Sequence, residues 1–256
     1  MDRPTYRESE HRKDFALVVG VEKYQGGIPR AQFADRDARA VARHLRALGI
    51  PPDHMTVLSD DVATRGRIKE ALAWLKRNVK SGSTVWVYFS GHGAPNRRGD
   101  AYLVPFGGDP SGLRYTALRV STLYRDLNTL SVKQVIVALD ACFTGEGKRS
   151  ILGKVRPLVT TIRTGAVPRS GKLIVLTASQ ADQESGVLDA KGHGLFTYYL
   201  LKGLNGGAVR GGHVTVASLY RYVKPRVREK ANLDNRSQTP ELEPRNAGSG
   251  ASVRLR

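Results

Sequence analysis

Two side chains capable of nucleophilic chemistry follow two apolar segments of this chain. Cys142, the single cysteine, comes shortly after the apolar run 135–139, and His92 comes shortly after the run 85–89. A lone cysteine forms neither an internal disulfide nor a multi-cysteine metal site, so it is either a thiol nucleophile or an inert buried residue. An imidazole is the partner that activates a cysteine nucleophile. The pair therefore predicts covalent catalysis by a thiol.

The elements that must position these residues are visible in the hydrophobic pattern. Short apolar runs rich in β-branched residues predict strands at 15–21, 55–58, 85–89, 135–139 and 173–177, with a short one at 102–105. Apolar residues at helical spacing predict helices at 34–48, 64–79, 121–130, 196–204 and 219–227, the last kinked or broken near Pro225. This alternation predicts an α/β fold with a mostly parallel sheet covered by helices on both faces.

The length of 256 residues suits one such domain. We place this domain at 14–242, preceded by a polar, mobile arm at 1–13 and followed by a flexible tail at 243–256. Within the domain, residues 145–171 break the pattern and form a long basic loop between two strands.

The residues around the cysteine and the histidine are similar to a known pair of motifs. Ser90-Gly-His-Gly and Asp140-Ala-Cys-Phe-Thr-Gly resemble the histidine and cysteine motifs of caspase-like cysteine peptidases, family C14. The histidine also precedes the cysteine by about fifty residues, as in caspases. Asp-Ala-Cys, in place of the Gln-Ala-Cys of animal caspases, is closer to metacaspases and bacterial orthocaspases. The resemblance extends over 15–242 and implies a caspase-like α/β/α sandwich.

The resemblance also implies an activity, that of a cysteine endopeptidase. His92 and Cys142 would form the catalytic dyad, and the backbone amides of Gly93 and Cys142 would hold the oxyanion. The alternative for Gly93 is a tight turn only.

In metacaspases, aspartates at two matching motif positions line the pocket for a basic side chain. The matching residues here are Asp37 and Asp140, and alternation along the strand places Asp140 on the same face as Cys142. Ser179, after the next strand, is a candidate for the rim of this pocket. Cleavage is then expected after Arg or Lys. The alternatives are a carboxylate that stabilises a helix N-terminus for Asp37 and a solvated loop for Ser179.

A pocket that accepts basic side chains also has candidate cleavage sites within the chain itself. If the protein matures by proteolysis, we expect it to be cut in the basic loop, at Lys148, Arg149, Lys154, Arg156, Arg163 or Arg169. The competing interpretation is an intact enzyme in which the loop is a flap.

The charge balance leaves other functions open. Lys and Arg total 41 against 23 Asp and Glu, a formal net charge of +18. Such a charge is compatible with nucleic-acid binding, but zinc-finger spacing, a ribonucleoprotein aromatic motif and a phosphate-binding loop are all lacking, so we regard nucleic acid as an unlikely partner. A catalytically idle scaffold or signalling module is the other alternative. The partners expected from the leading hypothesis are protein or peptide substrates.

We expect no cofactor and no bound metal. The remaining histidines, His11, His44, His54, His193 and His213, lack metal-ligand spacing and are predicted to have surface or capping roles. Some metacaspases use calcium, but no dense acidic ligand loop supports a calcium site here. No apolar run approaches the length of a membrane span, and the first residues lack an apolar signal region, so we expect a cytoplasmic protein. The sequence leaves the oligomeric state open.

Overall fold

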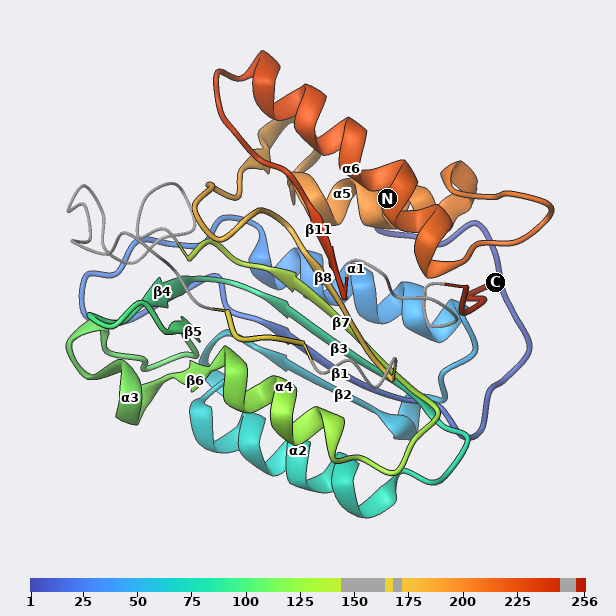
Figure 1. The fold of residues 1–256 in the computed structure, drawn as a ribbon, viewed down its shortest axis with the longest axis horizontal. Coiled ribbons are helices and arrows are strands. Elements are labelled where there is room, and N and C mark those ends of the chain that lie inside the picture. The colour runs from blue at the N-terminus through green and yellow to red at the C-terminus, as the bar shows by residue number, and fades with distance from the viewer. Residues whose placement is uncertain (144–163, 168–171, 245–251) are drawn as a thin grey trace.

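A six-stranded sheet forms the centre of the protein, whose computed structural model describes residues 1–143, 164–167, 172–244 and 252–256. Its parallel strands are β1 (Phe15–Gly20), β2 (Met55–Ser59), β3 (Thr84–Ser90), β7 (Gln134–Asp140) and β8 (Leu173–Thr177). The strand order is β11-β8-β7-β3-β1-β2, and β11 (Glu241–Glu243) pairs antiparallel with β8 (Figure 1). The mostly parallel sheet predicted from the sequence is thereby confirmed.

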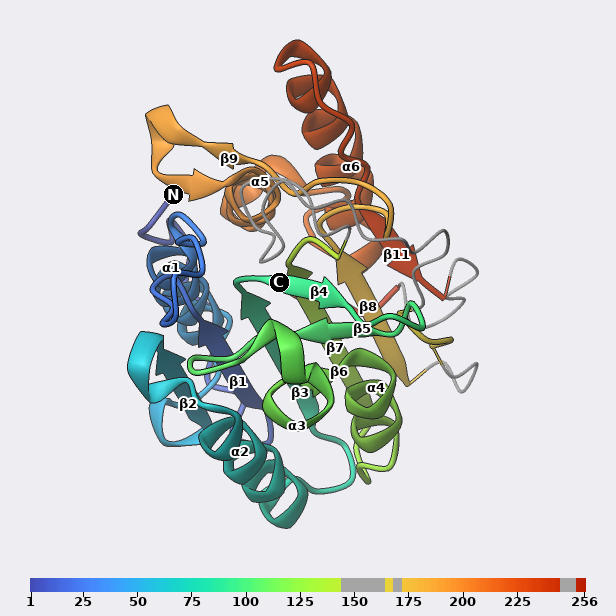
Figure 2. The ribbon, with the colours of Figure 1, turned by 90° about the vertical axis from the view of Figure 1, so that its left-hand side faces the viewer.

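Because successive side chains of a strand point to opposite faces, each apolar strand supplies two cores. Val18, Tyr88 and Ile136 face one core, which is shared with α1 (Ala34–Ala47), α5 (Leu195–Lys202) and α6 (Val216–Leu233). The neighbouring residues Leu17, Val87 and Val137 face the other core, shared with α2 (Arg65–Asn78) and α4 (Val120–Asn128). The two helical layers lie on opposite sides of the sheet (Figure 2). The fold is the predicted α/β/α sandwich.

Smaller elements lie in the segments that connect the main strands and helices. A three-stranded antiparallel sheet consists of β4 (Gly93–Pro95), β5 (Ala101–Leu103) and β6 (Leu118–Arg119). A two-stranded sheet consists of β9 (Val187–Leu188) and β10 (His193–Gly194). Short helical segments are α3 (Leu113–Thr116), η1 (Pro52–His54), η2 (Asp60–Val62), η3 (Pro110–Gly112), η4 (Asp189–Lys191) and the π-helical η5 (Gly203–Gly207).

Of the kink or break predicted near Pro225, the break is wrong, because α6 continues through this residue, and the kink stays a prediction. A proline removes one backbone donor from a helix. Here Tyr222, Val223 and Val227 stay buried on both sides of it, and their packing holds the helix together.

Both ends of the chain contact the layer that contains α1 and α6. In the predicted arm, the amides of Glu8 and His11 donate to the carbonyls of Ala47 and Gly49 at 2.7 Å each. Near the C-terminus, the amide of Leu255 donates to the Val214 carbonyl at 2.7 Å. The flexibility predicted for both segments stays a prediction. Most of the basic loop, with its six candidate cleavage sites, lies outside the described residues.

Candidate active site

Neighbouring strands deliver the histidine and the cysteine to one edge of the sheet. In the parallel register of β3 and β7, Ser90 lies beside Asp140, the last residue of each strand. His92 and Cys142 each follow two residues later, and both side chains are fully buried. The carboxyl edge of a parallel sheet is where α/β folds place ligands. The register therefore brings the two candidate catalytic residues into the same region.

Gly93 contacts the backbone at the cysteine. A Cβ atom at this position would lie 2.5 Å from the carbonyl oxygen of Cys142 and 2.8 Å from the ring of Phe143. Real Cβ contacts are longer, so a side chain here would push the two segments apart. The glycine predicted to supply an oxyanion amide is thus packed against the candidate nucleophile, and the close approach excludes larger residues whatever the role of the amide.

His92 is oriented by two residues of the loop that follows β1. Its Nε2 lies 2.6 Å from the carbonyl oxygen of Pro29. A carbonyl only accepts, so Nε2 carries the proton and Nδ1 is the nitrogen that can act as a base. The backbone amide of His92 donates to the Tyr24 hydroxyl at 2.8 Å, and that hydroxyl donates to Val104 O at 3.0 Å. Sequence patterns gave no signal for Tyr24 or Pro29, because both act from an irregular loop.

The thiol of Cys142 lies under the loop that follows β8. Its Sγ donates to the carbonyl oxygen of Gln183 at 3.5 Å, and the Ser179 hydroxyl donates to the same oxygen at 3.3 Å. The Ser185 hydroxyl lies 3.2 Å from the Ser179 hydroxyl oxygen and 3.4 Å from the Ala141 carbonyl oxygen, and its single hydrogen serves one of the two. Ser179 is 5% exposed, so it lies in a buried network beside the candidate nucleophile and not in a solvated loop. Its predicted role in a substrate pocket stays a prediction.

Asp37 and Asp140 converge on the beginning of α5. Asp37 accepts the Gly194 amide at 2.9 Å, and its other oxygen lies 2.7 Å from Nδ1 of His193. Asp140 accepts the Thr197 hydroxyl at 2.6 Å and the Thr197 amide at 3.3 Å. Both carboxylates are fully buried, where the N-terminus of a helix favours negative charge. The structure thus brings the two predicted pocket residues to one helix end.

The surface role predicted for His193 and His44 is wrong. His193 is 1% exposed. Its Nδ1 contacts the buried Asp37, and its Nε2 lies 3.7 Å from Asp2 of the N-terminal segment. His44 is fully buried on the inner side of α1, with the Tyr6 hydroxyl 3.2 Å from its Nδ1. Burial lowers the pKa of His44 to about 4. Spacing along the sequence carries no information on which histidines other segments cover.

Within the described ranges, no group of three or more His, Cys, Asp or Glu residues is arranged to hold a metal ion. Among the helices of those same ranges, none has the length and apolar character needed to span a bilayer.

Two known proteins are similar in sequence to parts of this chain. Metacaspase-1 of Mycosarcoma maydis is 33% identical over 84 residues, which cover 30% of this chain and 21% of that protein. Metacaspase-5 of Trypanosoma brucei brucei is 29% identical over 112 residues, which cover 38% of this chain and 22% of that protein. The chain therefore matches about a fifth of the length of these two relatives.

Solved structures show the same fold. A protein from Geobacter sulfurreducens superposes with a TM-score of 0.64 at 19% identity, covering 94% of this chain and 97% of the other. Caspase-1 from Spodoptera frugiperda superposes with a TM-score of 0.60 at 14% identity, covering 94% and 90%. At such identities the likeness concerns the fold alone. The model of the caspase domain, peptidase C14, matches residues 13–248, and the chain therefore belongs to the caspase-domain family.

Proposed function

We propose that this chain is a cysteine endopeptidase in which Cys142 is the nucleophile and His92 transfers protons. The single observation that carries the proposal is the register of β3 and β7, which sets both residues at one sheet edge, two positions beyond paired strand ends. The packing of Gly93 against the Cys142 carbonyl supports it further. Membership in a peptidase family agrees with this chemistry.

The reaction uses a thioester intermediate. Nδ1 of His92 takes the proton of the Cys142 thiol. The resulting thiolate bonds to the carbonyl carbon of the substrate, and the carbonyl electron pair moves to oxygen, where the amides of Gly93 and Cys142 are the candidate donors. As the C–N bond breaks, His92 donates a proton from Nδ1 to the leaving amine. Nδ1 of His92 then takes a proton from water, whose oxygen attacks the thioester carbon. The C–S bond breaks, the acid product leaves, and His92 returns the proton to the sulfur, which restores the thiol. Pro29 holds the imidazole through Nε2 during both transfers.

Cleavage after Arg or Lys is the specificity we propose. Asp140 lies two residues before the nucleophile. Asp37 accepts the amide of Gly194 at the start of α5, the helix to which Asp140 also bonds. Two buried carboxylates make a region that stabilises a guanidinium or ammonium group. Ser179 would lie at the rim of such a pocket, since it shares Gln183 O with the thiol. Substrates would be proteins or peptides with a basic residue before the cleaved bond.

A set of fluorogenic peptides tests the proposal. Wild type should cleave peptides with Arg or Lys before the reporter and leave the matching Asp peptide intact, and Cys142→Ala and His92→Ala should each abolish turnover while keeping the melting temperature. The assay is run with and without calcium, so that any requirement for this ion is detected. Turnover by purified Cys142→Ala would exclude the mechanism. A wild type that is inactive and whose thiol resists iodoacetamide would favour an idle scaffold.

Self-cleavage within residues 145–171 is part of the same proposal. The candidate sites are Lys148, Arg149, Lys154, Arg156, Arg163 and Arg169, which match the proposed preference for basic residues. Intact-mass analysis of wild type beside Cys142→Ala should find fragments ending at these residues in the wild type alone. An active wild type that stays uncut would remove this part of the proposal.

A further inference from the structure

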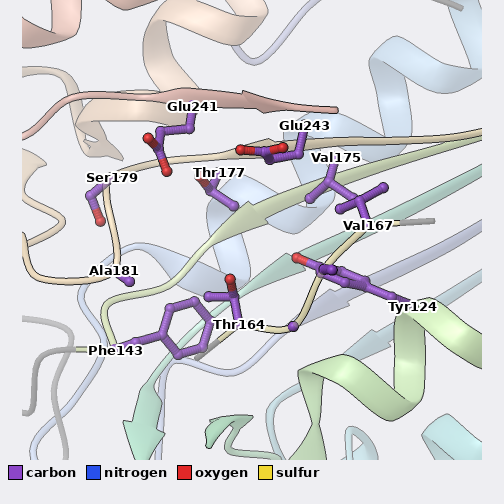
Figure 3. A pocket seen from close by; sticks show the side chains of 12 residues that line it. Tyr124, Phe143, Thr164, Val167, Val175, Thr177, Ser179, Ala181, Glu241 and Glu243 are labelled. Carbon is purple, nitrogen blue, oxygen red and sulfur yellow. The ribbon is translucent and has the colours of Figure 1, made fainter. Parts of the chain in front are cut away.

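The cavity beside Phe143 is not lined by the two aspartates of the proposed pocket. It has a volume of about 170 Å³ and lies under the edge strand β11 (Figure 3). Its acidic residues, Glu241 and Glu243, both come from that strand. Asp37 and Asp140 bond instead to the start of α5. The contacts that shape the proposed pocket for arginine and lysine are therefore those at α5.

His193 holds one oxygen of the Asp37 carboxylate. Its Nδ1 lies 2.7 Å from Oδ1, and because a carboxylate only accepts, Nδ1 carries the proton of this hydrogen bond. The amide of the next residue, Gly194, donates to Oδ2 at 2.9 Å. The two donors are consecutive residues of β10, directly before α5. They fix the plane of the carboxylate relative to the backbone that starts this helix.

The imidazole of His193 is itself enclosed by the chain. It is 1% exposed, and its Nε2 lies 3.7 Å from Oδ2 of Asp2, which is beyond hydrogen-bond distance. Arg36 holds Asp2 in place, since its guanidinium donates to both carboxylate oxygens at 2.7 and 3.2 Å. The N-terminus accordingly lies beside α1 and β9 (Figure 2). In the part of the chain that the structure describes, the hydrogen bond to Asp37 is the only one that the imidazole makes.

A buried histidine is costly unless its polar atoms are used. An apolar side chain of similar size would fill this space without taking an imidazole out of water. The second aspartate of the proposed pocket has a comparable side-chain donor, because the Thr197 hydroxyl donates to Asp140 at 2.6 Å and the Thr197 amide does so at 3.3 Å. Each of the two carboxylates thus accepts from a backbone amide and from a side chain at the start of α5, an arrangement that sets its orientation.

The orientation of a carboxylate matters more for arginine than for lysine. A guanidinium is planar and matches the two oxygens of a carboxylate with a rigid fork of donors, whereas an ammonium is a compact charge that binds from many directions. We propose that His193 is a positioning residue, which fixes the plane of the Asp37 carboxylate and thereby makes the peptidase prefer arginine over lysine before the cleaved bond. The inference rests on the proposed function and deepens it, because it ranks the two substrate classes named there.

Two substitutions of His193 separate hydrogen-bond donation from packing. His193→Asn keeps an N–H donor on the atom that follows Cγ, as Nδ1 does, whereas His193→Phe keeps a ring without a donor. The kcat/KM of wild type should be about tenfold higher for an Arg peptide than for the matched Lys peptide, which is what one additional charge-assisted hydrogen bond supplies. This ratio should stay within about twofold of wild type in His193→Asn and fall to about one in His193→Phe.

The kinetic constants separate positioning from a general loss of structure. The drop in His193→Phe should be a higher KM for the Arg peptide with little change in kcat, because the contact is made in the bound substrate and in the transition state alike. A role in packing alone would give the opposite order, with the ratio kept in His193→Phe and lost in His193→Asn. His193→Leu is a second variant without a donor, for use if the Phe protein does not fold.

His54→Gln and Glu243→Gln are the matched controls. His54 is a half-buried histidine whose ring stacks on Phe15 at 4.2 Å, in the core on the opposite side of the sheet. Glu243 is a carboxylate of the cavity in Figure 3. Both variants should keep the Arg-to-Lys ratio of wild type. A changed ratio in Glu243→Gln would assign the basic side chain to that cavity and overturn the inference.

Binding to the inactive Cys142→Ala protein tests the same inference without cleavage. The probes are two fluorescent peptides that differ only in Arg or Lys at one position, and the ratio of their Kd values should follow the kcat/KM ratio through the His193 variants. An inactive wild type, with an arginine preference in binding that His193→Phe removes and His193→Asn keeps, supports the inference and refutes only the peptidase function.

The remaining outcomes count against His193. Cleavage by wild type with the same Arg-to-Lys ratio in His193→Phe and His193→Leu overturns the positioning role alone, and so does an equal loss of the ratio in His193→Asn and His193→Phe. A wild type that cleaves Arg and Lys peptides equally well also overturns it. A protein that neither cleaves nor binds peptides with a basic residue overturns both proposals.

Discussion

Replacing Thr197 with valine removes the hydroxyl that connects two strands to α5. This hydroxyl donates to Asp140 at 2.6 Å, because a carboxylate only accepts, and it then accepts from the Tyr88 hydroxyl, also at 2.6 Å. All three side chains are fully buried. Valine keeps the shape of threonine, so the loss of these two hydrogen bonds is the main change.

The expected cost follows from the two bonds. A hydrogen bond to a charged group contributes about 1.5–3 kcal/mol and a neutral one about 0.5–1.5 kcal/mol, which gives roughly 2–4.5 kcal/mol for Thr197→Val. At roughly 2–4 °C per kcal/mol for a chain of this size, the melting temperature should fall by about 4–18 °C. Tyr88→Phe removes only the neutral bond and should cost about 0.5–1.5 kcal/mol.

Chemical denaturation of the single and double variants forms a double-mutant cycle. The double variant should be destabilised by about as much as Thr197→Val alone, because the bond to Tyr88 is already lost in that variant. Thr129→Val, which removes an exposed hydroxyl that bonds to the Asp126 carbonyl, is the control and should stay within about 0.5 kcal/mol of wild type. A Thr197→Val protein that loses less than about 1 kcal/mol, or a fully additive cycle, would refute the assigned network.

Two further predictions concern packing and pH. Gly93→Ala should reduce kcat/KM by about a hundredfold and stability by about 1–3 kcal/mol, since its Cβ would collide with the Cys142 carbonyl. Gly66→Ala, whose Cβ would make only an ordinary contact with Thr64 at 3.9 Å, should do neither, and an active Gly93→Ala protein would contradict the packing argument. His44, with its pKa lowered to about 4, resists protonation when folded but not when unfolded, so stability should fall by about 3 kcal/mol as the pH drops from about 6.5 to about 4. In His44→Gln the melting temperature should depend less on pH across that window, and an unchanged dependence would contradict the assignment. A hydrogen bond to Arg36 lowers the pKa of Asp2 to about 2, so Asp2 affects stability only below about pH 4.

Local sequence patterns were enough to predict the scaffold. The apolar runs that became β3 and β7 are buried along their whole lengths apart from Thr84, and the residues that follow them carry the histidine and the cysteine. Burial on both faces requires continuous apolar runs, and the alternation with helices requires parallel strands. The position of His92 and Cys142 at one sheet edge therefore follows from local patterns together with the rules of α/β topology.

The environment of these residues depended on contacts between distant segments. Asp37 meets His193 across 156 positions of the sequence, and Pro29 meets His92 across 63. The spacing of apolar residues shows that a helix has a buried face, but it does not show which segment covers that face, so His193 was expected at the surface. The sequence by itself determined the mostly parallel α/β scaffold and the two reactive residues, and tertiary packing decided which carboxylates and hydroxyls surround them.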